Sequence, residues 1–181
     1  MNNDAKINEA VTKLGIILLN NGFQFTRDGF KAVKYPLTKE ALKIIITEKT
    51  GLSPDNMSLY DAKYYVTDWE TWKYVIDKVM IDAMVYQIDF SDCDNFAFLF
   101  TAISSMIFGL SSAPVVTGQI YNATTNEPIT RHAFNFIVAK DGNNFNVYCY
   151  EPQSDRETII RKGLPTIIRN WKYTFDWLTL F

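Results

Sequence analysis

The chain has 181 residues and a mass of 20.9 kDa, of which 48% are apolar and 21% are charged. These values exclude disorder over the whole chain, because they leave enough apolar surface to build a core. The net charge of -2 supplies no excess of basic residues to neutralise phosphates, so we expect no nucleic-acid partner. The two cysteines, Cys93 and Cys149, are too few for a disulfide scaffold.

The beginning of the chain has no basic stretch followed by an apolar one, so the sequence predicts no signal peptide. The longest apolar run, Phe96 to Leu110, is shorter than the roughly 20 residues that a membrane crossing needs. We therefore expect no transmembrane segment and no membrane partner. The expected location is the cytoplasm of a host cell, or a virus particle assembled there.

Residues 1–66 are predicted to form an N-terminal helical region. Apolar residues at helical spacing predict a helix over Ile7–Leu19 and another over Lys39–Thr50, which Gly51 ends. The pattern between residues 55 and 65 fits one helical turn and a loop. A third helix, reaching to about Ala83, is predicted to begin at a capping box in which Thr67 is the N-cap and Glu70 reaches back to it.

Residues 67–181 are predicted to form an α+β core. A strongly apolar helix runs from Cys93 to about Phe108 and is ended by Gly109, and strands follow it. The predicted strands cover residues 115–121, 132–139, 145–151 and 171–180, with a hairpin turn at 141–144 and a short helix near 155–162. One buried helix packed on an antiparallel sheet, with further helices earlier in the sequence, is an α+β layout.

The start of the apolar helix is a candidate nucleophilic site. Cys93 lies there, with Asp92 or Ser91 as the cap, and the free N–H groups and the helix dipole favour a thiolate. A nucleophilic cysteine also needs a base, and the only histidine of the sequence, His132, follows 39 residues later on a predicted strand.

The hairpin predicts a partner for that histidine. If Lys140 pairs with Phe145 across the turn, the residue numbers of each opposed pair sum to 285, so Phe134 lies opposite Glu151. His132 and Glu151 then share one face as diagonal neighbours, at about 7–8 Å between Cα atoms. We expect Glu151 to orient the imidazole of His132. By contrast, Cys149 lies in the middle of a predicted strand and is expected in the core.

A fourth candidate is Gln87, six residues before Cys93, whose amide can donate to an oxyanion together with the Cys93 N–H. The order Gln, Cys, His and acid resembles papain-like cysteine peptidases. The strings Asp92–Ala97, Arg131–Asn135 and Tyr150–Gln153 are similar to two subgroups. These are the transglutaminase-like cysteine peptidases of bacteria and their viruses, and the papain-like C-terminal domain of a mushroom agglutinin.

The resemblance covers roughly Trp69 to Gln153. It implies a papain-like or transglutaminase-like core and a thiol protease of phage or bacterial type, with Cys93 as nucleophile, His132 as base and Glu151 as orienting acid. The segment between Cys93 and His132 is much shorter than in papain, so no substrate subsite can be transferred. Gln87 matches by spacing alone.

The leading hypothesis is therefore a thiol hydrolase, a cysteine peptidase or amidase, that cleaves an amide bond of a peptide or protein substrate through a Cys93–His132–Glu151 triad. Transfer of the acyl group to an amine, cleavage of peptidoglycan, and a non-catalytic structural or binding protein such as a virion component remain open. The oligomeric state is not predicted.

No cofactor is expected, although calcium stays an alternative at Asp89, Asp92, Asp94 and Asn95. Their spacing is not that of an EF-hand loop. The mushroom relative depends on calcium, so the resemblance implies this alternative.

Overall fold

The computed structural model describes residues 32–79 and 92–180, which belong to one compact unit. The described residues contain three α-helices, α2 (Lys39–Thr50), α3 (Trp69–Lys78) and α4 (Cys93–Phe108), and one 3-10 helix, η1 (Pro54–Asn56). The helices predicted at Lys39–Thr50 and from Cys93 are confirmed. The helix predicted over Ile7–Leu19 lies outside the described residues.

The strands are β1 (Tyr35–Thr38), β2 (Met57–Leu59), β3 (Lys63–Asp68), β4 (Val115–Asn122), β5 (Pro128–Asp141), β6 (Asn144–Glu151), β7 (Arg156–Ile159), β8 (Thr166–Ile168), β9 (Trp171–Tyr173) and β10 (Trp177–Leu180). They join into one sheet in the order β1-β3-β5-β4-β10-β2. The β6–β7 pair extends from β5, and the β9–β8 pair extends from β4. Two pairs, β3 with β5 and β2 with β10, are parallel, so the sheet is mixed and the α+β class is confirmed.

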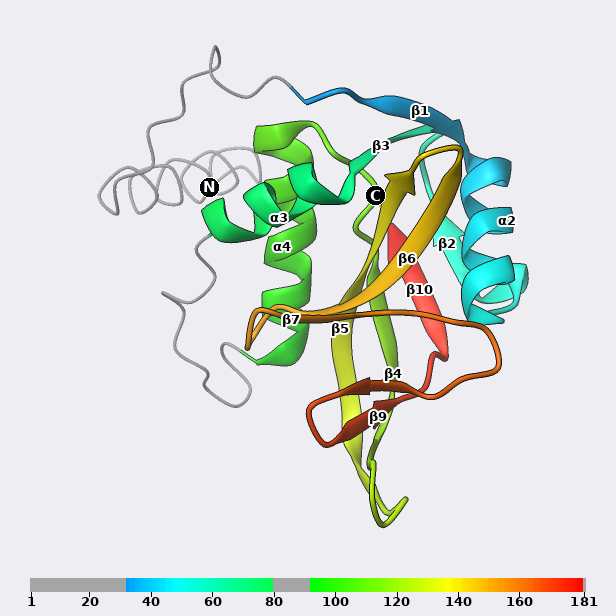
Figure 1. Ribbon diagram of the computed structural model, residues 1–181, viewed down its shortest axis with the longest axis vertical. Helices are drawn as coiled ribbons and strands as arrows, with labels where there is room; N and C mark the ends of the chain where they lie inside the picture. Colours follow the sequence, from blue (N-terminus) through cyan, green and yellow to red (C-terminus); the bar gives the residue numbers. More distant parts are fainter. Residues whose placement is uncertain (1–31, 80–91, 181) are drawn as a thin grey trace, which may run out of the picture. The chain divides into compact units, whose positions relative to one another are not determined.

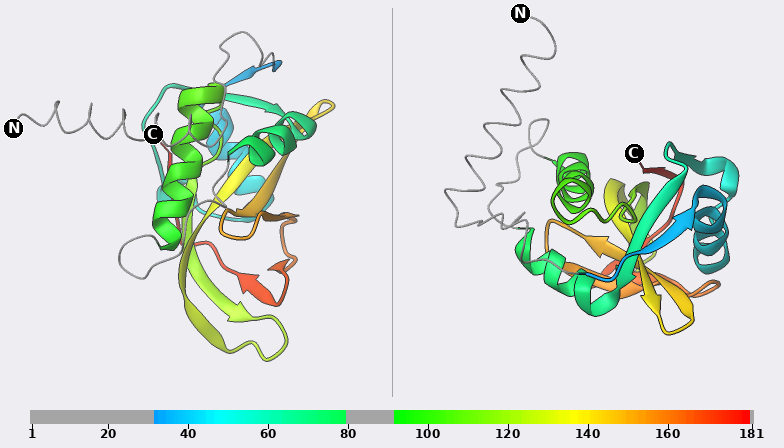
Figure 2. Two further views of the ribbon diagram at one scale, coloured as in Figure 1. Left: turned by 90° about the vertical axis from the view of Figure 1, so that its left-hand side faces the viewer. Right: turned by 90° about the horizontal axis from the view of Figure 1, so that it is seen from above.

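Helices α2 and α4 cover opposite faces of the central strands (Figures 1 and 2). Leu42 and Ile46 of α2 share a core cluster with Phe134, Phe136 and Val138 of β5. Helix α4 packs on the alternate residues of β5. Because both faces are covered, every residue of β5 from His132 to Ala139 is buried, and the polar–apolar alternation of a half-exposed strand is absent.

The structure differs from the expected division of the chain after residue 66. That position falls inside β3, whose residues Thr67 and Asp68 pair with Ala139 and Lys140 of β5. Strand β2 likewise pairs with β10, near the end of the chain. Residues before 67 therefore contribute strands to the same sheet as the residues after it.

Two local predictions are corrected. Asp68, and not Thr67, is the N-cap of α3, because its carboxylate accepts a hydrogen bond of 2.8 Å from the N–H of Thr71. The segment near 155–162 forms strand β7 instead of a helix, because Arg156 pairs with Glu151 and so extends the sheet beyond β6. Among the described helices, none has the length and apolarity that a membrane crossing requires.

Candidate functional site

The candidate nucleophile lies where helix α4 begins. Asp92 is the N-cap and Cys93 is the first helical residue, and the backbone N–H of Asp92 donates to the side-chain oxygen of Asn95 at 3.2 Å. Cys93 is partly exposed and packs against a small cluster formed by Ala97, Val115 and Ala133. The thiol is thus held at the helix start and remains reachable.

The β5–β6 hairpin brings the other two predicted residues together. Its register follows the prediction, since Lys140 pairs with Phe145 and the ladder continues in step to Asn135 and Tyr150. Beyond the last pair, Nε2 of His132 lies 2.5 Å from Oε2 of Glu151. His132 is 8% exposed and Glu151 only 2%, so this contact is shielded from water.

Cys93 and His132 change each other's protonation. A hydrogen bond from the His132 ring holds the pKa of the Cys93 thiol below its ordinary value, although partial burial acts in the opposite direction. Burial by itself lowers the pKa of His132. The hydrogen bonds to Cys93 and Glu151 outweigh that effect and raise the pKa of His132 to about 9. Both shifts favour a thiolate beside an imidazolium over a neutral thiol beside a neutral imidazole.

Strand β9 completes the surroundings of the carboxylate. The hydroxyl of Tyr173 donates to Oε2 of Glu151 at 3.1 Å, and the N–H of Gln153 donates to its other oxygen at 3.3 Å. Trp171 presents its ring edge-on to His132, with 5.9 Å between ring centroids. Sequence reasoning missed Trp171 and Tyr173. The spacing of two residues on a strand places both on one face, but no local pattern indicates that this face meets Glu151.

Asn135 ties the helix that carries Cys93 to the strand that carries His132. This side chain is fully buried, and its Nδ2 atom donates to the carbonyl of Ala97 at 3.1 Å and to the hydroxyl of Thr101 at 3.0 Å. Both acceptors belong to α4, whereas Asn135 follows His132 by three residues on β5. Buried hydrogen bonds therefore join the helix that begins at Cys93 to the strand that carries His132.

The structure brings together three of the four predicted site residues: Cys93, His132 and Glu151. The fourth, Gln87, lies outside the described residues. Cys149 is fully buried, and burial raises the pKa of its thiol well above the ordinary value, so it is a core residue as expected. Chemically, the arrangement provides an accessible sulfur nucleophile, a proton carrier beside it and a buried carboxylate behind the carrier.

The calcium alternative finds no support in the part of the chain that the structure describes. Within residues 32–79 and 92–180, no three or more histidine, cysteine, aspartate or glutamate side chains gather in a way that would hold a metal ion. One of the four proposed ligands, Asp89, lies outside those residues.

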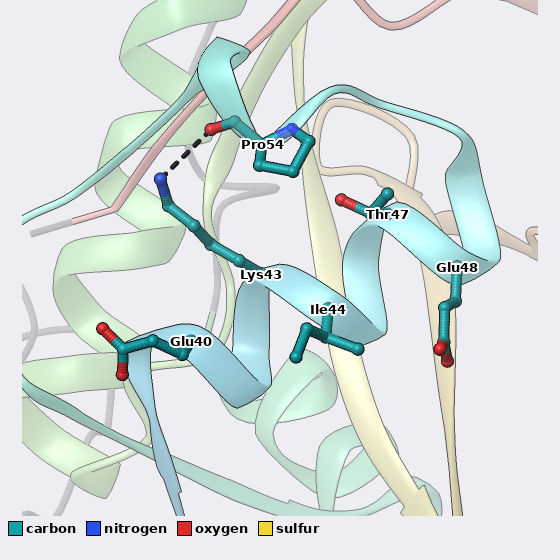
Figure 3. Close-up of a pocket in the computed structure, with 6 residues that line it drawn as sticks. All are labelled: Glu40, Lys43, Ile44, Thr47, Glu48 and Pro54. Carbon is teal, nitrogen blue, oxygen red and sulfur yellow. Dashed lines mark hydrogen bonds between the residues drawn. The ribbon is translucent and has the colours of Figure 1, made fainter.

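A pocket of about 450 Å³ opens along α2 (Figure 3). It is lined by Glu40, Lys43, Ile44, Thr47, Glu48 and Pro54. Lys43 reaches across one end and donates to the carbonyl of Pro54 at 3.1 Å. None of the three residues of the candidate site lines this pocket, so it is separate from Cys93.

Comparison with known proteins gives a fold likeness only. No family model matches the chain, and no curated protein matches it either. A solved structure titled "PSL1a-E64 complex" matches with a TM-score of 0.56 and 18% identity, over 80% of this chain and 51% of that one. A structure of the Polyporus squamosus lectin, titled as bound to the epitope Neu5Aca2-6Galb1-4GlcNAc, matches with a TM-score of 0.56 and 17% identity, over 80% of this chain and 49% of that one.

These comparisons overturn the family assignment made from the sequence. The likeness is to solved structures of which one is titled as a lectin, and no papain-like or transglutaminase-like family model matches the chain. We therefore do not assign the chain to those peptidase families, and we drop the description as a thiol protease of phage type. The chain spans about half the length of the structures that it matches, and it shares their fold over that span.

Proposed function

We propose that Cys93, His132 and Glu151 form an acyl-transfer site in which a thiolate attacks the carbonyl carbon of an amide or ester. The observation that carries this proposal is the buried contact of 2.5 Å between His132 and Glu151, behind a thiol whose pKa is lowered by the same imidazole. The proposal rests on the geometry of three side chains and does not depend on membership in any family.

The chemical step follows from the protonation states. The sulfur of Cys93 forms a bond to the carbonyl carbon, and the bond from that carbon to the leaving nitrogen or oxygen breaks. The imidazolium of His132 gives its proton to the leaving group, which leaves a thioester and a neutral ring. Water or an amine then bonds to the thioester carbon and gives a proton to His132, the carbon–sulfur bond breaks, and Cys93 leaves as a thiolate. Glu151 keeps the ring in the orientation that both steps need.

The acyl acceptor and the natural substrate are open, so the first test uses an activated acyl ester as a chemical probe. Wild-type protein is mixed with p-nitrophenyl acetate, and the acetylated residue is located by mass spectrometry. We expect rapid acetylation at Cys93, followed by loss of the acetyl group. Cys149 is the internal control, because it is fully buried and should stay unmodified.

The matched variants are Cys93→Ala, which removes the nucleophile, and His132→Ala, which removes the proton carrier. Both should abolish turnover while the far-UV circular dichroism spectrum stays unchanged. If wild-type Cys93 reacts no faster than a free cysteine in a peptide, or if Cys93→Ala turns over the ester equally well, the acyl-transfer site does not exist.

A second candidate function, favoured by the comparisons, is a non-catalytic binding protein for carbohydrate. The observation behind it is that a structural neighbour is titled as a lectin bound to a sialylated trisaccharide. At 17% identity this likeness concerns the fold, and this chain spans about half of that one. The glycan partner is therefore a proposal for this protein.

The test is a titration with the same trisaccharide, followed by tryptophan fluorescence. Trp171 and Trp177 are 38% and 44% exposed, so a bound sugar near either indole would change the emission. Saturable binding that is unchanged in Cys93→Ala supports a binding protein that works independently of the thiol. Absence of any saturable change, together with ester turnover at Cys93, favours the acyl-transfer site.

A further inference from the structure

We infer that Tyr173 is a positioning residue, whose hydroxyl fixes the carboxylate of Glu151 opposite His132. The inference deepens the proposed acyl-transfer function and rests on it. Tyr173 belongs to β9, outside the stretch from Trp69 to Gln153 on which the sequence-based site was built.

His132 and Tyr173 share one oxygen atom of Glu151. Oε2 of Glu151 lies 2.5 Å from Nε2 of His132 and accepts a hydrogen bond of 3.1 Å from the hydroxyl of Tyr173. The other oxygen receives the N–H of Gln153 at 3.3 Å. A glutamate side chain has three rotatable bonds, and these contacts restrain it at both oxygens.

Both partners of this hydrogen bond are buried. Glu151 is 2% exposed and Tyr173 is 4% exposed, so water cannot replace the phenol as a hydrogen-bond donor. A carboxylate held opposite the imidazole stabilises the positive charge of the ring. Without the Tyr173 hydroxyl, Glu151 is held less firmly in that position, so the imidazolium of His132 and the thiolate of Cys93 are both less stabilised.

The phenol of Tyr173 stays protonated. Burial and the nearby charge of Glu151 raise the pKa of Tyr173 well above its ordinary value. The phenol therefore remains a hydrogen-bond donor over the whole range in which Cys93 and His132 titrate. It acts through Glu151, since its hydroxyl donates its hydrogen bond to that carboxylate.

Ring packing and strand pairing hold Tyr173 in place. Its ring packs edge-on against Phe134, at 5.0 Å between centroids, and its backbone pairs with Ile120 of β4 and with Thr166 of β8. A phenylalanine at 173 would keep these contacts and lose the hydroxyl alone. Tyr173→Phe is therefore a narrow test of the hydrogen bond.

The experiment compares Tyr173→Phe with Tyr64→Phe. Tyr64 is a matched control, because it is also buried in the same core cluster and its hydroxyl accepts a partly buried hydrogen bond of 2.8 Å from the N–H of Asp61. Two quantities are measured against pH in each protein: the rate of Cys93 alkylation by iodoacetamide, and the NMR shift of the His132 ring. The sequence has one histidine, so the NMR signal needs no assignment.

We expect Tyr173→Phe to shift the alkylation profile of Cys93 to higher pH and the titration of His132 to lower pH. The expected loss of alkylation rate at about pH 6 is on the order of tenfold, the usual size for one hydrogen bond to a charged group. Tyr64→Phe should leave both profiles where they are in the wild type, even if it lowers the melting temperature by a similar amount.

A double variant shows whether Tyr173 acts through the carboxylate. In the Glu151→Gln background, adding Tyr173→Phe should change the alkylation profile no further. A ring-fluorinated tyrosine at position 173 covers the case in which Tyr173→Phe fails to fold, because it keeps the hydroxyl and makes it a stronger donor. It should shift both profiles in the direction opposite to that of Tyr173→Phe.

The outcomes separate the two proposals. If wild-type Cys93 alkylates like an ordinary thiol and His132 titrates near 6.5, the acyl-transfer site is absent and the role of Tyr173 falls with it. If the wild type shows the thiolate but Tyr173→Phe matches Tyr64→Phe, or the fluorinated residue leaves the profiles unmoved, Tyr173 is an ordinary core residue and the acyl-transfer proposal stands.

Discussion

Gly118 and Thr174 approach each other more closely than any residue with a side chain would allow. A Cβ atom placed on Gly118 would lie 1.8 Å from the carbonyl oxygen of Thr174. Gly118 pairs with His132 in the β4–β5 ladder, and Thr174 follows Tyr173 directly. The absence of a side chain at Gly118 therefore lets the backbone that follows Tyr173 lie close against β4, beside the candidate site.

Gly118→Ala is expected to destabilise the protein and to weaken the site. The added methyl group forces the backbone at 173–175 away from β4, which costs about 3 kcal/mol of unfolding free energy, at the upper end for overpacking. It also draws the Tyr173 hydroxyl away from Glu151, so Cys93 alkylation below neutral pH should slow. Urea denaturation and the iodoacetamide assay measure the two effects.

The control for this change is Thr117→Ala, the preceding residue on β4. Its backbone carbonyl, which accepts from the N–H of Asp176 at 2.9 Å, is kept in the variant. We expect a smaller loss of stability and an unchanged alkylation profile. A Gly118→Ala protein with wild-type stability would show that β9 does not depend on this close approach.

The titration of His132 is a second prediction. Its pKa in the native state is raised to about 9, against about 6.5 for an unperturbed histidine. Because the folded value is the higher one, protonated His132 stabilises the native state fully below about pH 6.5, and this contribution is lost as the pH rises through about 9. The NMR shift of the ring should therefore stay constant near pH 6.5 and change near pH 9.

Two comparisons check the cause of that shift. In urea the same resonance should titrate near the unperturbed value, because the contacts with Cys93 and Glu151 are lost. In the native Cys93→Ala protein the titration should move downward, because the hydrogen bond to the thiol helps to raise the pKa of His132. A native midpoint near 6.5 would contradict the thiolate–imidazolium pair.

The reactivity of the second cysteine gives a third prediction. Cys149 is fully buried and the pKa of its thiol is raised by that burial, so it should resist iodoacetamide in the native protein at any pH that preserves the fold. It should react at the rate of an ordinary thiol once urea unfolds the chain. The ratio of the two alkylated peptides in mass spectrometry measures this. Native labelling of Cys149 at the rate of Cys93 would contradict the core that the structure describes.

The contact between His132 and Glu151 could be predicted from the sequence because it depends on local information. The turn at Asp141–Asn144 sets the register of the hairpin, and a register once set places every later pair. The two ends of α4 could be predicted from equally local information. Polar residues before Cys93 mark its beginning, and Gly109 after Phe108 marks its end.

The contributions of Tyr173 and Asn135 could not be predicted in this way. Tyr173 lies 22 residues after Glu151 in the sequence, and the path of β7, β8 and β9 decides whether the two come into contact. The segment that forms β7 was interpreted as a helix, so this path could not be predicted. A short strand at the edge of a sheet has too few residues to show a period of two. The parallel pairing of β3 with β5 joins residues 72 positions apart (139 − 67), and no local pattern encodes it.

The last prediction concerns Asn135, whose buried amide joins α4 to β5. Asn135→Ala removes the donor to the oxygen of the Thr101 hydroxyl and one of the donors to the carbonyl of Ala97, which still accepts from that hydroxyl. The expected loss of unfolding free energy is about 2 kcal/mol, within the usual range for the loss of a buried hydrogen-bond partner. Urea denaturation at constant m-value measures it, with Asn143→Ala in the exposed hairpin turn as control.

The rate of Cys93 alkylation should fall as well in Asn135→Ala, because the start of α4 is no longer held against the strand that carries His132. An Asn135→Ala protein as reactive as the wild type would mean that packing against Val115 and Ala133 alone keeps Cys93 in place.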